Sequence, residues 1–570
     1  MTPWLARFAL VAVVVLESAC GTARDGSGGR RAVPDIPAPP ATVSRIVPAP
    51  TSLAADREIL HVLNRLAYGP RPGDVERVRA MGVNAWIERQ LHPEQIPDGA
   101  LEGRLAAYPT IRMTVDELFR EYPRPDPVAV ARRREEMLRG EGGSEGMARE
   151  TTPGEPRRIV ITAELAAARM ERAVWSERQL QEVLVDFWFN HFNVYAQKDV
   201  VRWMVSPYER EAIRPHVLGR FRDLVLATAR HPAMLFYLDN WLSTRAGLVV
   251  PSGPNQGRRL GINENYAREL LELHTLGVDG GYTQGDVVEV ARAFTGWSFA
   301  YPQGDKQFVF RPRAHDDGDK RVLGHVIAAG GGEADGLAVI DIVTRHPSTA
   351  RAIATKLVRR FVSDEPAPAL VDRVARTYRD TDGDIRAMML TIVTAGEFWS
   401  PESRRAKIKK PIELVASAAR ALDASPGPET GPRSAGFQLA RAVRQLGEPL
   451  FNAQPPTGYP DTADAWVNTG ALLGRMNFAL SLAQNRIPGV SVDVDRLVAG
   501  ADRRRPGEVL DRLLAVTLHG QVSRPTREIL AGQLGNAEIV RRTADEGGPA
   551  NTDVEKLAAL VLGSPEFQRR

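Results

Sequence analysis

A helix that is apolar on nearly all sides places the strongest limit on how this chain folds. Residues 180–193 read LQEVLVDFWFNHFN. At about 100° per residue, their apolar side chains cover most of the circumference, and only a narrow stripe is polar. A helix of this kind is buried within a larger helical body. The stripe consists of Glu182, Asp186, Asn190 and Asn193.

Polar side chains inside a protein need partners, because an unpaired buried group costs about 1–3 kcal/mol. We therefore expect the stripe either to face a polar pocket or to bond to the backbone of neighbouring segments. His191 lies on the apolar side, which favours a core histidine over a ligand.

Residues 261–297 (GINENYARELLELHTLGVDGGYTQGDVVEVARAFTGW) predict a helix, a glycine turn and a second helix. The first helix is amphipathic, with His274 on its apolar face and Leu276 as an exception among the charges. Gly277 suits the end of this helix, and Thr283 with Asp286 resembles a capping box for the next. The polar face of the first helix holds Glu264, Asn265, Arg268, Glu269, Glu272 and Thr275.

Several blocks of the sequence resemble a large bacterial family catalogued as domain of unknown function 1800. The core signature matches NENYAREL at 263–270 and FTGW at 294–297. Further blocks are HVLNRLAYGPRPGDVERVRAMGVNAWIERQL at 61–91, QLQEVLVDFWFNHFNVY at 179–195 and PPTGYP at 455–460, where the family commonly has Trp in place of Tyr459. The resemblance covers residues 55 to 570. It implies a fold and an export habit, but no established reaction.

Composition and pattern together predict a mainly α protein with one small β-hairpin. The 570 residues are 43% hydrophobic and 25% charged, which leaves ample material for a core. We expect a helical core domain at 55–423, interrupted by a disordered insertion at about 124–158, and a C-terminal helical part at 437–570 packed on that core. The net charge is only +4, and no basic run with interleaved aromatic residues suggests nucleic-acid binding.

The N-terminus has the features of an export signal. One arginine and a short apolar run occupy residues 1–19, too short to span a membrane. The only cysteine, Cys20, stands where bacterial lipoproteins are cut and acylated; the alternative is an ordinary signal peptide with a coincidental cysteine. Residues 20–54, rich in Gly, Pro and Ala, predict a flexible tether. We thus expect an exported lipoprotein on the cell envelope, in the outer membrane if the cell has one.

Strand signals gather near residues 305–327. Phe308–Phe310 and Arg321–Leu323 flank an Asp-rich segment containing Asp-Gly, which predicts a hairpin. His315, His325 and the nearby aspartates suggest a metal site, but Asp-rich turns are common without metal. A single cysteine also excludes a Cys-ligated metal site and a disulfide within the chain. We predict neither a metal nor a cofactor.

The leading functional hypothesis is a polar pocket shared by the stripe and the charged helix. Paired carboxylates near an arginine suit acid–base catalysis or the binding of a sugar polymer or peptide. The catalytic candidates are Asp186, Glu264, Arg268, Glu269 and Glu272. The binding candidates are Asn190, Asn193, Asp239, Asn240, Asn263, Asn265, Trp466 and Asn468.

Such a protein would act on an envelope or extracellular polymer. The alternative is a non-catalytic binding or scaffold lipoprotein. Members of the family that it resembles are often encoded beside a second exported, sulfatase-like family, which implies such a protein as a partner.

Overall fold

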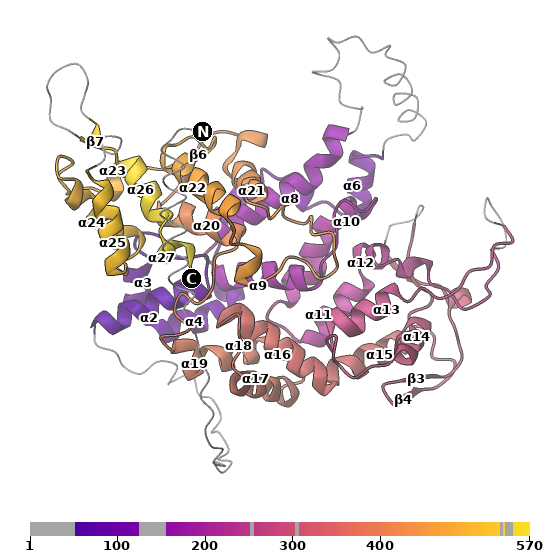
Figure 1. Ribbon diagram of the computed structural model, residues 1–570. Coiled ribbons are helices and arrows are strands. Elements are labelled where there is room, and N and C mark those ends of the chain that lie inside the picture. Colours follow the sequence, from indigo (N-terminus) through magenta and orange to yellow (C-terminus); the bar gives the residue numbers. More distant parts are fainter. Residues whose placement is uncertain (1–51, 125–154, 251–255, 302–306, 536–539, 542–550) are drawn as a thin grey trace, which may run out of the picture.

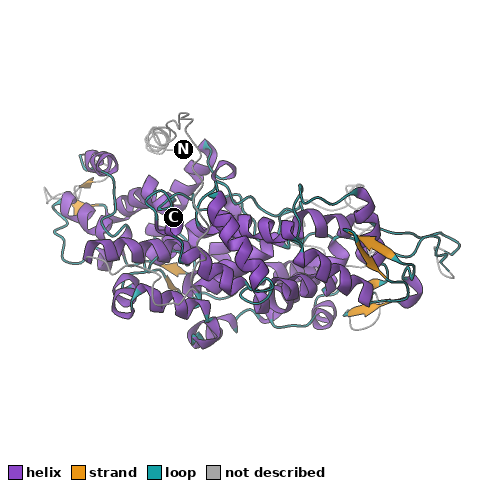
Figure 2. Ribbon diagram, turned by 90° about the horizontal axis from the view of Figure 1, so that it is seen from below, coloured by secondary structure: helices purple, strands orange, loops and turns teal. Residues whose placement is uncertain are grey.

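The structure is a computed structural model that describes residues 52–124, 155–250, 256–301, 307–535, 540–541 and 551–570. Helices make up most of it, and the few strands are short (Figures 1 and 2). The predicted mainly α fold is confirmed. The predicted signal peptide, Cys20 and residues 20–51 of the tether lie outside the described residues, as do residues 125–154 of the predicted insertion. None of the helices that the structure describes combines the length and the apolar character needed to cross a membrane.

The described chain begins with helices that pack on the centre of the body. Helix α2 starts at Ser52, slightly before the predicted start of the body. Residues 68–70 (Tyr-Gly-Pro) lie between α2 and α3. These elements are α2 (Ser52–Arg65), α3 (Asp74–Met81), α4 (Val83–Leu91), η2 (Pro93–Gln95), α5 (Gly99–Leu105), η3 (Pro109–Ile111) and α6 (Val115–Glu121).

Two helices form the centre of the molecule, α8 (Glu155–Trp175) and α9 (Gln179–His191). In α9 the apolar residues other than the half-buried Phe187 are buried, and so are Glu182 and Asp186, which confirms the predicted buried helix. Helix α8 packs against α20 (Pro411–Ala421) and α21 (Ala435–Gln445), which come from the C-terminal third of the chain. Figure 1 shows these helices above α9, with α16 (Pro347–Phe361) below it.

The segment with the predicted charged face, Glu264, Arg268, Glu269 and Glu272 (the charged ladder), contains an irregular turn. After α13 (Asn265–Glu269) the chain forms a π-helical turn, η8 (Leu270–His274), and α14 (Gln284–Ala293) follows with the predicted capping box. A π-helix bonds residue i to i+5 and widens the turn, so positions after Leu270 leave the phase of an α-helix. Leu276 and Thr275 are therefore both buried, and the prediction that they lie on the charged face is wrong.

The strands near residue 310 form two hairpins. Strand β1 (Trp297–Phe299) pairs with β2 (Phe308–Phe310), and β3 (Lys320–Val322) pairs with β4 (His325–Ile327). A hairpin thus lies within the predicted range, but β2 and β3 do not pair with each other. The β3–β4 turn is Leu323-Gly324, whose φ angles of 49° and 82° are those that a two-residue hairpin turn requires.

The remaining helices enclose the ends of the body, and the last residue of the sequence returns to the interior. Arg569 forms an isolated bridge with Ile408, and the side chain of Arg570 is buried. The elements between α9 and α20 that have not yet been named are α10 (Val201–Pro207), η5 (Tyr208–Ile213), η6 (Arg214–His216), α11 (Phe221–Arg230), α12 (Pro232–Tyr237), η7 (Asn240–Leu242), η9 (Pro312–Ala314), α15 (Ala334–Arg345), α17 (Pro368–Asp380), α18 (Ile385–Val393) and α19 (Gly396–Trp399). The later ones are β5 (Ser425–Pro426), η10 (Gly431–Arg433), η11 (Ala463–Ala465), α22 (Thr469–Ala483), β6 (Val490–Ser491), α23 (Val494–Leu497), α24 (Pro506–Thr517), α25 (Arg524–Gln533), β7 (Val540–Arg541), β8 (Asn551–Thr552), α26 (Val554–Leu562) and α27 (Pro565–Gln568).

A buried ion-pair network joins α8, α9 and the π-helical η5. Glu209 accepts from Arg169 at 2.5 Å and from Arg214 at 3.0 Å, and Arg172 lies 3.7 Å away. Arg214 also pairs with Glu182 of α9 at 2.6 Å. The Glu209 side chain is only 2% exposed. Charges removed from water need partners, so this carboxylate holds three arginines in place.

Replacing Glu209 with Gln should therefore destabilise the protein strongly. We expect the free energy of unfolding in urea to fall by about 3–5 kcal/mol, the usual cost of leaving a buried charge unpaired. Glu211 on the same turn pairs with Arg210, but its side chain is 54% exposed. Glu211→Gln should cost less than about 1 kcal/mol. Similar losses in the two variants would contradict the assigned role of Glu209.

Acid should act through the same carboxylate. Burial alone would raise the pKa of Glu209, but Arg169, Arg214 and Arg172 lower it from 4.5 to about 2. The contribution of Glu209 to stability is therefore complete above pH 4.5 and is lost as the pH falls through 2. Glu209→Gln should show a smaller loss of stability than the wild type across this pH range.

Candidate functional site

A cavity of about 310 Å³ lies between α9, α16 and the proline-rich loop 455–462. It brings together three segments that are far apart in the sequence. Four of its lining side chains are cationic, Lys356, Arg359, Arg360 and Lys410, and Phe187, Tyr459 and Pro460 supply an apolar part. The lining residues are Phe187, Asn190, His191, Lys356, Arg359, Arg360, Lys410, Thr457, Tyr459, Pro460, Asp461 and Thr462.

The loop is held against α9 by the predicted polar stripe. Asn190 donates from Nδ2 to the carbonyl of Tyr459 and accepts from the Tyr459 N–H at Oδ1, both at 2.7 Å. Asn193 donates to the carbonyls of Ala453 and Pro455 at 2.9 Å. The sequence predicts that the stripe either faces a polar pocket or bonds to neighbouring backbone. Both apply, because Asn190 bonds to the loop backbone and also lines the cavity. The two asparagines position the loop through hydrogen bonds to its backbone.

Asp186 lies deeper in α9, between two buried cations. Lys410 Nζ is 2.6 Å from one carboxylate oxygen, and Arg169 is 3.1 Å from the other. Burial opposes ionisation of Asp186, but Lys410 and Arg169 outweigh it and lower its pKa. Lys410 also lies 3.3 Å from Glu448, whose pKa burial raises to about 7 although Lys410 lowers it. Asp186 is therefore an ionised partner of Lys410, which lines the cavity, but Asp186 itself does not line it.

Arg360 forms the second paired cation of the wall. It lies 2.5 Å from Glu413 and 3.1 Å from Asp461, and its side chain is 1% exposed. Burial alone would raise the pKa of Asp461, but Arg360 and Lys407 lower it well below its usual range. Nε and Nη2 of Arg360 are buried and have no hydrogen-bond partner among the described residues.

Lys356 and Arg359 face the same cavity without carboxylate partners among the described residues. Lys356 Nζ donates to the carbonyl of Leu273 and to His191 Nδ1, both at 3.0 Å. His191 Nε2 therefore carries the ring proton and donates to the carbonyl of His274 at 3.1 Å. Arg359 donates only to the backbone carbonyl of Asp364, at 3.3 Å.

Burial disfavours the charged form of Lys356, and its position beside Arg359 adds to this effect. Together they lower the pKa of Lys356 to about 8, and burial holds the pKa of His191 well below its usual value. The π-helical turn η8 supplies the carbonyls of Leu273 and His274, so the irregular turn positions this corner of the cavity. Lys356 and Arg359 together leave an uncompensated positive charge at the wall.

The charged ladder of 264–272 lies in a different setting from Asp186. Arg268 pairs with Glu264 at 3.0 Å, and their side chains are 41% and 35% exposed. Gln284 bonds to both of them. Glu272 accepts from Tyr282 at 3.5 Å, and burial together with Glu272 raises the pKa of Glu269. The ladder acids and Asp186 thus bond to separate groups, and none of the ladder residues lines the 310 Å³ cavity. Their catalytic role stays a prediction.

The remaining predicted binding residues hold the backbone in place. Asn240 donates to the carbonyls of Phe294 and Trp297, and Asn265 donates to that of Leu238. Asn263 Oδ1 accepts from the N–H of Asn265, and Asn468 caps α22. Asp239 pairs with Lys198 at 2.9 Å, while Trp466 donates to the carbonyl of Pro460 at the back of the loop.

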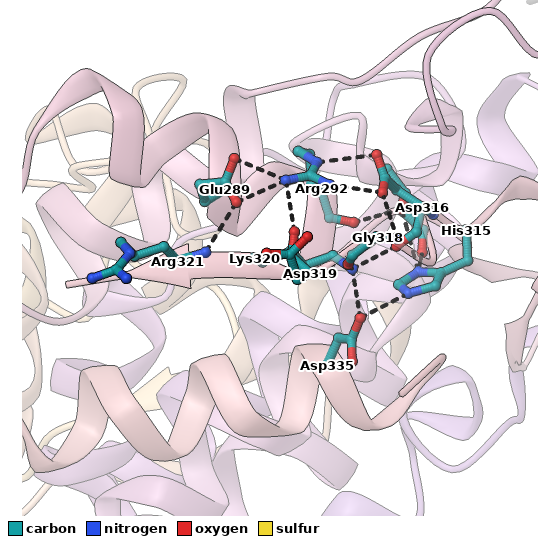
Figure 3. Close-up of polar contacts among 10 residues, drawn as sticks. Glu289, Arg292, His315, Asp316, Gly318, Asp319, Lys320, Arg321 and Asp335 are labelled. Atoms are coloured by element: carbon teal, nitrogen blue, oxygen red, sulfur yellow. Dashed lines mark hydrogen bonds and ion pairs between the residues drawn. The ribbon is translucent and has the colours of Figure 1, made fainter. Parts of the chain in front are cut away.

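The Asp-rich segment considered for metal binding is filled by a lysine (Figure 3). Lys320 Nζ donates to the carbonyls of Asp316 and Gly318 and to the carboxylate of Asp335, at 2.5, 2.7 and 2.6 Å. His315 Nε2 lies 3.0 Å from the same carboxylate, while His325 is exposed on β4. The ammonium group thus occupies the point where the oxygen atoms converge. Among the described residues, no group of three or more His, Cys, Asp or Glu is placed to hold a metal ion.

Sequence reasoning missed the four cations of the cavity. Arg360 gives a usable signal, because it shares the apolar face of α16 with Leu357 and Phe361, and an arginine there needs buried partners. Lys410 follows Lys407 and Lys409 in a run that is typical of a solvated surface. Nothing local separates it from an ordinary exposed lysine.

Fold and site together define a mainly α protein with a cation-lined cavity closed by a proline-rich loop. The chain belongs to the family described as Protein of unknown function (DUF1800), whose model matches residues 61–569. The resemblance seen in the sequence blocks is confirmed. Neither the comparison with curated proteins nor that with solved structures finds a match.

The close packing of the loop against α9 requires a glycine at position 458. Gly458 has a φ of 69°, and a Cβ there would lie 2.4 Å from both the carbonyl oxygen and Oδ1 of Asn190. We expect Gly458→Ala to detach the loop, to lower the free energy of unfolding by about 1–3 kcal/mol, and to speed amide hydrogen exchange at 459–462.

Gly447→Ala is the matched control. Gly447 also has a positive φ, 99°, but a Cβ there meets nothing within 4 Å. This variant shares the backbone strain and lacks the clash, so exchange at 459–462 should stay close to that of the wild type. Equal acceleration in both variants would show that contact with Asn190 does not hold the loop.

Proposed function

We propose that the cavity binds an anionic group, a carboxylate, sulfate or phosphate, that belongs to a larger ligand. The observation that carries this proposal is the pairing of its four cations. Arg360 and Lys410 each have two carboxylate partners, whereas Lys356 and Arg359 have none among the described residues.

An anion would complete the electrostatics of this wall. A cation held away from water is costly unless an opposite charge pairs with it. Lys356 and Arg359 lie one helical turn apart on α16, at i and i+3, so one anion can reach both. The guanidinium of Arg359 suits the planar or tetrahedral oxygens of such a group. Phe187, Tyr459 and Pro460 provide an apolar wall for the body of the ligand.

The lining favours binding over acid–base catalysis. Asp461 is the one carboxylate among the lining residues, and Arg360 and Lys407 already pair with it. Acid–base catalysis by paired carboxylates, as considered from the sequence, needs carboxylates that are free to exchange a proton at the reacting atoms. Of the two functions considered from the sequence, the non-catalytic binding protein is therefore the one we propose for this cavity.

The cellular setting is proposed from the sequence. An export signal at 1–19, acylation of Cys20 and a tether at 20–54 would present the body at the cell envelope. The ligand would then be an envelope or extracellular polymer that carries acidic groups. An exported sulfatase-like protein, implied by the family resemblance, is the proposed partner.

Lys356→Met tests the binding proposal, because it keeps the length of the side chain and removes its charge. We expect affinity for sulfate, phosphate or acetate, measured by calorimetry, to fall at least about tenfold, in line with about 1.5–3 kcal/mol for a hydrogen bond to a charged group. Binding by the wild type should also weaken as the pH rises through 8, because the pKa of Lys356 is about 8 and the ammonium is lost above it.

Arg351→Ala is the control on the same helix. Arg351 is 60% exposed and pairs with Asp372 on the surface. This variant should bind anions as the wild type does. If Lys356→Met binds as well as Arg351→Ala, or if no anion binds the wild type, the proposal is wrong.

Cys20→Ser tests the proposed lipid anchor. Without the thiol the chain cannot be acylated at this position, so the full-length protein should move from the membrane fraction to the soluble fraction of its native host. Mass spectrometry of the wild-type N-terminal peptide should show acyl chains on Cys20. A wild-type peptide without acyl chains would show an ordinary signal peptide instead.

A further inference from the structure

A second concave surface lies between α21 and α22, and it shares no lining residue with the cavity beneath the 455–462 loop. It is an open groove of about 670 Å³, lined also by residues 486–488. Its volume is within the range of small-molecule binding sites. The lining residues are Arg433, Gln438, Arg441, Ala442, Gln445, Leu446, Gly474, Asn477, Phe478, Ser481, Arg486, Ile487 and Pro488.

Three arginines surround this groove, and no carboxylate does. Arg433, Arg441 and Arg486 are all exposed. None of them forms an ion pair within the part of the chain that the structure describes. The groove therefore carries an uncompensated positive charge that favours an anionic ligand.

The rest of the accessible surface combines uncharged polar side chains with apolar ones. Gln445 and Asn477 are exposed, and Gln438 and Ser481 are half-buried. Amides and hydroxyls donate and accept hydrogen bonds, which suits the hydroxyl groups of sugars. Among the apolar residues, Phe478, Ala442 and Ile487 form the floor and are only 7%, 8% and 9% exposed, whereas Leu446 is half-buried and Pro488 is exposed.

We propose that the groove between α21 and α22 binds an acidic polysaccharide, with the three arginines contacting its carboxylate or sulfate groups and the amides contacting its hydroxyls. This site is separate from the cavity beneath the 455–462 loop and goes beyond the function proposed for it. Two such sites on one body would let the protein hold a long polymer at two places.

Binding of defined polymers tests this proposal. The probes are polygalacturonate for carboxylates, dextran sulfate for sulfates, neutral dextran, and polyglutamate as an acidic peptide. We expect the wild-type protein to bind at least one of the acidic polysaccharides and not neutral dextran. Arg441→Ala and Arg486→Ala should each weaken that binding by about three- to tenfold, the range expected for one exposed charge-assisted contact.

Arg376→Ala is the matched control, because Arg376 is also exposed, has the same charge, forms no ion pair within the described residues, and lies on α17, well away from α21 and the groove (Figure 1). It should bind within about twofold of the wild type, since a distant surface charge is largely screened at physiological salt. The proposal is overturned if Arg376→Ala weakens binding as much as Arg441→Ala, if polyglutamate binds as tightly as the polysaccharides, or if neither acidic polysaccharide binds.

Discussion

The structure depends on the pairing of charges that have been removed from water. Asp186 and Glu182 lie on a helix whose other faces are apolar, so neither can reach solvent. Each is matched by a basic group from another element, Asp186 by Arg169 and Lys410, and Glu182 by Arg214. Because a buried pair tolerates little displacement, these contacts fix how α8, α20 and the turn at 214–216 approach α9.

The same network shapes the cavity. Lys410 and Arg360 point their charges toward Asp186, Glu413 and Asp461, and in doing so they form the inner wall. The positive charges of Lys410 and Arg360 are therefore already paired with carboxylates of the protein. Lys356 and Arg359 differ, because they approach from α16 with only backbone and imidazole acceptors near them. The difference between the two pairs of cations arises from the fold, and it is what gives the cavity its capacity for an anion.

The sequence alone is sufficient for features that one helix or turn determines. Burial of α9 follows from its own composition, and the capping box of Thr283 and Asp286 needs only neighbouring residues; both predictions are confirmed. The pairing of β2 with β1 and the π-helical turn at 270–274 depend on tertiary packing. The distance between strands in the sequence therefore predicts the wrong partner for β2, and regular helical spacing predicts the wrong face for Thr275 and Leu276. The cavity combines α9, α16 and a loop near residue 459, and a single sequence contains no pattern that joins such distant segments. Its best local clue is Arg360 on an apolar helix face.

The buried position of Arg570 bears on the order in which the molecule forms. Its side chain lies 3.1 Å from Glu413 and donates to the backbone of Arg360, next to the cavity wall. A chain is synthesised from its N-terminal end, so these interior contacts are among the last that can be made. Until then Glu413 has one basic partner fewer, and the centre of the molecule stays incomplete. Closure of the interior thus waits for a segment that is far from Arg360 and Glu413 in the sequence, which favours late, concerted closure over folding of the N-terminal half by itself.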